Sequence, residues 1–103
     1  MKFNLNTYMA ENRIGKDKFA LVKKIECADG FSVSAQANEI NYCSPRESFL
    51  TDYSLVELGY PSDYMGDEFV EYCEDKENTT NTVYSYVPVE LVEALIDSHG
   101  VLL

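Results

Sequence analysis

The clearest pattern of hydrophobic and polar positions lies in residues 19–27 and 31–38, where apolar and polar side chains alternate on both sides of Ala28-Asp29-Gly30. Alternation of this kind predicts two β-strands joined by a tight turn. A three-residue turn gives one register, whose cross-strand pairs are Cys27–Phe31, Ile25–Val33, Lys23–Ala35 and Leu21–Ala37. This register collects apolar residues on one face, with Lys23 as its misfit, and needs Gly30 in a left-handed conformation. A two-residue Asp-Gly turn would mix polar and apolar residues on the same face, so we prefer the longer turn.

Helical spacing predicts a helix near each end of the chain. Residues 5–12 favour a short helix capped by Asn4 or Asn6, with Gly15 beyond its end. Its expected inward-facing residues are Leu5, Tyr8 and Met9, with Ile14 as a further candidate. A second helix is expected after Pro88, which is favourable in a first helical turn, and before Gly100. Its apolar positions recur every three or four residues, at Val89, Val92, Leu95 and Ile96.

The middle of the chain reads as a loop, a strand and an ambiguous segment. Residues 41–52 are interrupted by Pro45 and predict a loop, whereas residues 53–60 alternate and predict a third strand. Residues 63–75 fit a helix or a strand, and we favour a strand over residues 69–73 that pairs with residues 82–87. The expected architecture is one α+β domain over residues 1–103, with an antiparallel sheet of four to five strands and both helices on one face.

Composition narrows the classes of function. The chain has 103 residues, 46% of them hydrophobic, which argues against full disorder. Its formal net charge of -10 disfavours direct binding to nucleic acid or to an anionic membrane surface. No apolar run approaches the roughly 20 residues of a transmembrane helix, and residues 1–15 lack the apolar region of a signal peptide. We therefore expect a cytoplasmic protein whose three cysteines, none in a Cys-x-x-Cys motif, are free thiols.

The charge is divided unevenly between the two halves of the chain. Residues 1–46 contain seven basic and five acidic residues, whereas residues 47–103 contain thirteen acidic residues and one basic residue, Lys76. Acidic residues concentrate in residues 63–77, interleaved with tyrosines that offer rigid contact area for a protein partner. The expected partner-binding residues are Asp63, Asp67, Glu68, Glu71, Glu74, Asp75, Tyr64 and Tyr72.

Three interpretations of this acidic stretch stay open at the level of sequence. It is a solvated surface, a metal site, or a row of charges that imitates nucleic-acid phosphates. The spacing does not fit a calcium-binding EF-hand loop, which needs oxygen ligands at alternate positions. The regular spacing of side chains on a strand or on one helix face would suit the third interpretation. Several of the tyrosines are equally compatible with a role in the core.

No catalytic motif is present. The chain lacks a glycine-rich phosphate loop, a Gly-x-Ser-x-Gly sequence and a His-Glu-x-x-His sequence. The single histidine, His99, is explained by its place at a helix C-terminus, where the dipole favours a positive charge. A Cys–His nucleophilic pair would need Cys27 or Cys73 beside it. We therefore expect a protein that is not an enzyme and that uses no cofactor or metal.

Three segments, ALVKKIECADGFS (residues 20–32), YMA (residues 8–10) and YVPVE (residues 86–90), resemble small uncharacterised proteins carried by phages and mobile elements of gut Firmicutes. The resemblance would cover most of the chain. It implies a phage or prophage accessory protein. Many small acidic proteins of that kind inhibit host defence, including anti-CRISPR proteins that imitate DNA. The resemblance brings no functional residue with it.

Three functions follow as hypotheses. The first is inhibition of a basic nucleic-acid-binding host protein, such as a CRISPR effector, through the acidic half. The second is a homo-oligomer that binds or sequesters a small molecule such as a nucleotide, near the basic residues Lys16, Lys18, Lys23, Lys24 and Arg46. The third is a non-enzymatic accessory or structural protein of a phage.

Overall fold

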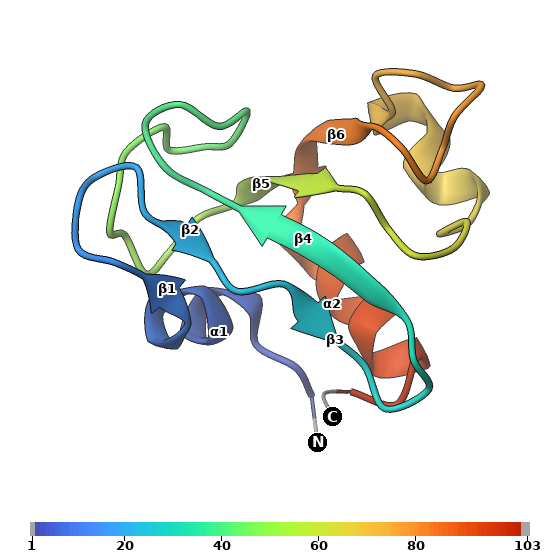
Figure 1. Cartoon of the computed structure of the whole chain (residues 1–103), viewed down its shortest axis with the longest axis horizontal. Helices are drawn as coiled ribbons and strands as arrows, with labels where there is room; N and C mark the ends of the chain where they lie inside the picture. The colour runs from blue at the N-terminus through green and yellow to red at the C-terminus, as the bar shows by residue number, and fades with distance from the viewer. Residues whose placement is uncertain (1, 102–103) are drawn as a thin grey trace.

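The computed structural model describes residues 2–101 of the chain. Within them the elements run in the order α1 (Leu5–Glu11), β1 (Arg13–Ile14), β2 (Leu21–Val22), β3 (Ile25–Glu26), β4 (Ser32–Gln36), β5 (Leu55–Gly59), the 3-10 helix η1 (Asp67–Tyr72), β6 (Val83–Pro88) and α2 (Val89–Ser98). In this part of the chain, β3, β4, β5 and β6 form a four-stranded antiparallel sheet in that order, and β1 pairs with β2 (Figure 1). The expected α+β class with a helix near each end is confirmed.

The hairpin of β3 and β4 forms in the register predicted from its alternating pattern. Ile25 pairs with Val33, and the amide of Cys27 donates to the carbonyl of Phe31 at 2.8 Å. Gly30 has a φ of 96°, the left-handed conformation that the three-residue turn requires. The side chains of the predicted inner face are buried from Ile25 onward, so burial of one face decides the register here.

The predicted pairs Lys23–Ala35 and Leu21–Ala37 are wrong. At Lys23 and Lys24 the backbone does not pair with β4. It forms hydrogen bonds with Tyr8 of α1 and with Asn12, the residue that follows α1. The amide of Lys23 donates to the carbonyl of Asn12 at 2.8 Å, and the Tyr8 hydroxyl lies 3.0 Å from the carbonyl of Lys23. Both lysine side chains are exposed as a result, which removes the misfit that a continuous strand would have buried.

This break also reverses the face on which the preceding residues lie. Val22 is buried, whereas Leu21, expected on the inner face, is 57% exposed. Val22 contacts β4 through a side chain: Gln36 accepts from its amide at 2.8 Å and donates to its carbonyl at 2.9 Å. Ile14 pairs with Leu21 across β1 and β2 and is 65% exposed, so its expected inward position is wrong as well.

The two α-helices form where they were expected. Asn4 caps α1 by accepting from the amide of Thr7 at 2.9 Å, and α1 buries Leu5, Tyr8 and Met9. The buried residues of α2 are Val89, Val92, Leu95 and Ile96, as its spacing predicts. α2 accepts backbone hydrogen bonds from the start of the chain, through Asp97 to Phe3 and through Glu93 to Leu5, both at 2.9 Å. The two helices therefore pack together, and α2 lies across one face of the sheet in Figure 1.

Residues 69–73 do not form the strand that we favoured. They overlap η1, in which the amide of Phe69 donates to the carbonyl of Gly66 at 3.2 Å and that of Cys73 donates to the carbonyl of Val70 at 3.1 Å. These bonds span three residues, as in a 3-10 helix. The predicted pairing with residues 82–87 is confirmed at one position, where Cys73 forms an antiparallel bridge with Tyr84 of β6. The third strand, β5, forms within residues 53–60 and lies between β4 and β6.

Candidate functional site

The acidic residues expected to bind a partner lie together on residues 63–77, which we call the acidic lobe. Its seven carboxylates are all exposed: Asp63, Asp67, Glu68, Glu71, Glu74, Asp75 and Glu77. Figure 1 shows η1 and the loop that follows it at a corner of the molecule, beside β6 and far from α1. Of the two tyrosines in the expected site, Tyr64 is 47% exposed, whereas Tyr72 is half-buried and packs against the core.

Apolar anchors hold the acidic lobe to the sheet and turn its charges outward. Met65, Phe69 and Cys73 are at most 5% exposed and belong to the core. The amide of Glu74 donates to the carbonyl of Val83 at 3.0 Å, which extends the contact with β6. Gly66 starts η1 with a φ of 119°, a conformation that side chains disfavour. The 3-10 turn thus places Phe69 inward and leaves its charged neighbours in solvent.

Local hydrogen bonds shift the pKa values of Asp75 and Tyr64 in opposite directions. Asn78 and the amide of Glu77 donate to Asp75 at 3.0 and 3.1 Å, and they lower the pKa of that carboxyl below its ordinary value. The hydroxyl of Tyr64 donates to the carboxylate of Asp67, and this bond raises the pKa of Tyr64. A hydrogen bond to the charged form favours ionisation, which is the cause at Asp75.

No carboxylate of the acidic lobe forms an ion pair within residues 2–101. In that part of the chain Lys18 pairs with Glu39 at 3.9 Å, and Nδ1 of His99 lies 2.6 Å from Asp29, a contact that is an ion pair only when the imidazole is protonated. Across the same residues, no group of three Asp, Glu, His or Cys side chains lies close enough to hold a metal ion. The lobe, which contains one basic residue, Lys76, therefore presents a net negative charge, which costs stability through mutual repulsion.

The pair of Asp29 and His99 is a feature that sequence reasoning missed. Nδ1 of His99 lies 2.6 Å from Asp29, and the imidazole stacks on Phe31 with ring centroids 4.2 Å apart. The amide of Phe31 donates to Asp29, and this bond, followed by that from His99, lowers the pKa of Asp29. The two residues are 70 positions apart, so no local pattern could have joined them. They line a pocket of about 360 Å³ together with Ser62.

No cysteine forms a nucleophilic pair with His99 within residues 2–101. Cys27, Cys43 and Cys73 are all buried, and none lines the pocket of His99. Burial raises the pKa of Cys27 and of Cys43, whereas nucleophilic thiols have lowered values. Ser62 in the same pocket accepts a hydrogen bond from the amide of Ser32 at 2.9 Å. The arrangement provides an oriented imidazole without an activated thiol.

The basic residues that we expected near a bound nucleotide do not form one site. Lys18 pairs with Glu39, and Arg46 donates to the backbone carbonyls of Glu39 and Ile40 at 3.2 and 3.3 Å. Lys23 and Lys24 are exposed next to β3. Lys16 lines a pocket with Arg13, a residue that the sequence did not single out.

No protein-family model, no curated protein and no solved structure matches this chain. No helix within residues 2–101 has the length and apolar character needed to cross a membrane.

Proposed function

We propose that this protein acts by binding, without catalysis, to a basic nucleic-acid-binding surface of a host protein. The acidic lobe occupies the place of nucleic-acid phosphates on that surface. The observation that carries the proposal is the set of seven exposed carboxylates that have no ion-pair partner within residues 2–101. Such charge stabilises a complex only when another molecule brings the opposite charge.

The construction of the acidic lobe supports a binding surface rather than a flexible acidic tail. Phe69 and Cys73 attach it to the core, and the bridge to Tyr84 continues the contact with β6. A fixed array of charges loses little conformational freedom on binding. Tyr64, exposed beside Asp67, adds an aromatic ring that would stand where a base stacks in the nucleic-acid site of the partner.

The resemblance to phage accessory proteins supports the choice of partner. In that setting the target would be a defence protein that reads DNA or RNA through arginines and lysines, such as a CRISPR effector. The cytoplasm of the host cell is the compartment in which the two would meet. The protein itself would bind neither nucleic acid nor a membrane surface.

The test is affinity capture from the lysate of a bacterial host, with duplex DNA as competitor. The wild-type protein should retain a DNA-binding protein at low salt, release it as salt rises, and lose it to added DNA. The variant Asp67→Lys/Glu68→Lys/Glu71→Lys should fold and retain nothing.

The matched control is Glu11→Lys/Glu26→Lys/Glu90→Lys, which changes the net charge equally at exposed positions outside the acidic lobe. It should bind like the wild type if the position of the charges matters. Equal loss in both variants would show that only net charge counts. If added DNA did not release the captured protein, the surface to which the acidic lobe binds would not be a nucleic-acid site.

A further inference from the structure

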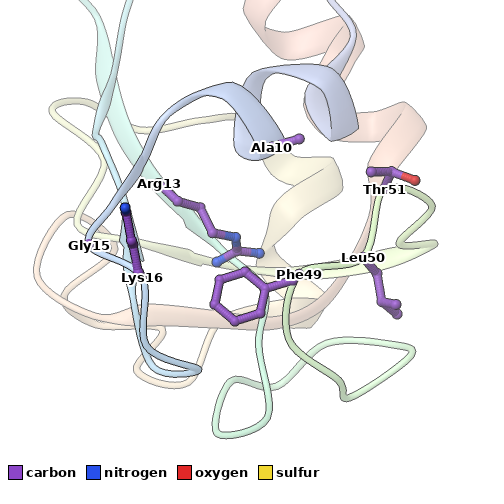
Figure 2. A pocket seen from close by; sticks show the side chains of 7 residues that line it. All are labelled: Ala10, Arg13, Gly15, Lys16, Phe49, Leu50 and Thr51. Atoms are coloured by element: carbon purple, nitrogen blue, oxygen red, sulfur yellow. The ribbon is translucent and has the colours of Figure 1, made fainter.

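A second pocket lies on the opposite side of the molecule from the acidic lobe. It has a volume of about 490 Å³, within the range of small-molecule sites. It opens between the turn that follows β1 and the loop that precedes β5 (Figure 2). Its lining residues are Ala10, Arg13, Gly15, Lys16, Phe49, Leu50 and Thr51. Two of them are cationic and none is acidic, in a protein whose net charge is -10.

Arg13 is held in a fixed position in this pocket without a carboxylate partner. Its guanidinium donates to the carbonyls of Ala20 at 3.1 Å and Ala37 at 2.6 Å, and to the hydroxyl of Tyr53 at 3.4 Å. The side chain is half-buried, and no carboxylate within residues 2–101 forms an ion pair with it. A guanidinium has five N–H donors, so the Nε hydrogen and one Nη1 hydrogen remain for a ligand.

Tyr53 connects Arg13 to the loop that forms the other wall. Its buried hydroxyl donates to the carbonyl of Glu47 at 2.5 Å and accepts from the amide of Leu50 at 3.3 Å. Asn6 of α1 brackets the backbone of Tyr53, with hydrogen bonds of 3.0 and 2.8 Å. The loop is thus positioned relative to Arg13 before any ligand arrives, as a specific binding site requires.

Phe49 occupies a conformation that core packing does not explain. Its φ is 62°, in the left-handed region that aromatic residues rarely adopt, and its side chain is 52% exposed. The Arg13 guanidinium carbon lies 5.8 Å from the centre of the Phe49 ring, and Figure 2 shows the two side by side. Strained residues of this kind concentrate at sites that bind ligands.

We propose that this pocket binds a small phosphate ester that carries a flat ring. The phosphate would take the remaining donors of Arg13 and the ammonium of Lys16, whose two charges match those of a phosphomonoester. The ring would stack on Phe49. This site is separate from the acidic lobe and goes beyond the function proposed above.

The test is a titration of the isotope-labelled protein followed by amide chemical shifts in NMR spectra at constant ionic strength. Adenosine 5′-monophosphate is the probe that has both parts, adenosine has the ring alone, and inorganic phosphate has the charge alone. The nucleotide should shift the amides of residues 13–16 and 49–51 and bind at least about tenfold more tightly than either fragment. Shifts confined to other residues, or none in the millimolar range, would overturn the proposal.

Two variants assign the contacts without removing the structural hydrogen bonds of Arg13. Phe49→Asn tolerates the left-handed backbone and removes the ring, and Lys16→Ala removes the second charge. Each should weaken nucleotide binding at least about fivefold. The matched controls are Phe19→Asn and Lys24→Ala, which change an exposed aromatic residue and an exposed lysine outside the pocket. Equal weakening by the controls would contradict the proposed site.

Discussion

The acidic lobe and the Arg13 pocket use charge in opposite ways. The lobe displays seven carboxylates on exposed side chains, with Phe69 as a main anchor beneath them. The pocket holds one guanidinium by three hydrogen bonds and places an aromatic ring beside it. Many exposed charges act together at long range and are screened by salt, whereas a positioned guanidinium acts by geometry at contact distance.

This difference suggests a division of roles within one small domain. A surface of unpaired charges suits a large partner of opposite sign, because each contact is weak and their number determines the affinity. A preorganised cation in a concave site suits a small ligand, because few contacts must each be well placed. The two regions should therefore respond differently to loss of an anchor, to loss of a cation and to acid.

The largest expected effect is at the anchor of the acidic lobe. Replacing Phe69, which is 1% exposed, by alanine removes an aromatic ring from the core beneath η1. We expect the free energy of unfolding to fall by about 3–5 kcal/mol in urea denaturation. The exposed neighbour Tyr64→Ala should change it by less than about 0.5 kcal/mol. A small effect of Phe69→Ala would mean that the lobe is not anchored as described.

A smaller effect is expected at the cation of the pocket. Arg13→Met keeps the apolar stem but leaves the carbonyls of Ala20 and Ala37 without their side-chain donor. The free energy of unfolding should fall by about 2–3 kcal/mol, the cost of unsatisfied polar groups. Lys16→Ala, in the same pocket, should change it by less than about 0.5 kcal/mol. Equal effects of the two changes would show that Arg13 is not a structural residue of the pocket.

The smallest effect is a selective response of the acidic lobe to acid. Because the pKa of Asp75 is lowered in the folded protein, its contribution to stability is present above the ordinary value of 3.8 and is lost as the pH falls through the lowered value. The amides of Glu77 and Asn78, which donate to Asp75, should lose protection from hydrogen exchange over that interval. The contacts of Arg13 should persist, because a guanidinium keeps its charge there.

The control for this pH response is Asn78→Ala, which removes the side-chain donor to Asp75. In that variant these amides should be less protected at neutral pH than in the wild type. Their protection should also fall less when the pH is lowered. If amide protection in the wild type and the variant were identical at every pH, the ionisation of Asp75 would not stabilise this loop.

The sequence predicted the parts of the fold that local patterns determine. The register at Ile25 and Val33, the left-handed Gly30 and the inward face of α2 all follow from burial of one face of a strand or helix. The acidic lobe was also predicted as a continuous stretch of sequence, because its charges are neighbours along the chain. Its secondary structure was not, because residues 63–75 fit both a helix and a strand, whereas the structure has a 3-10 turn that follows Gly66 with its positive φ.

The remaining features were decided by contacts between residues far apart in the chain. The strand ahead of Ile25 breaks because Tyr8 and Asn12 bind the backbone at Lys23, and His99 meets Asp29 only through the packing of α2. The pocket exists because Tyr53 joins Arg13 to the loop of Phe49. Periodicity determines which side chains are buried where an element continues unbroken, as in β4 and α2. The hydrogen bonds that a buried polar group finds depend on which elements pack against it, and that is settled only in the tertiary structure.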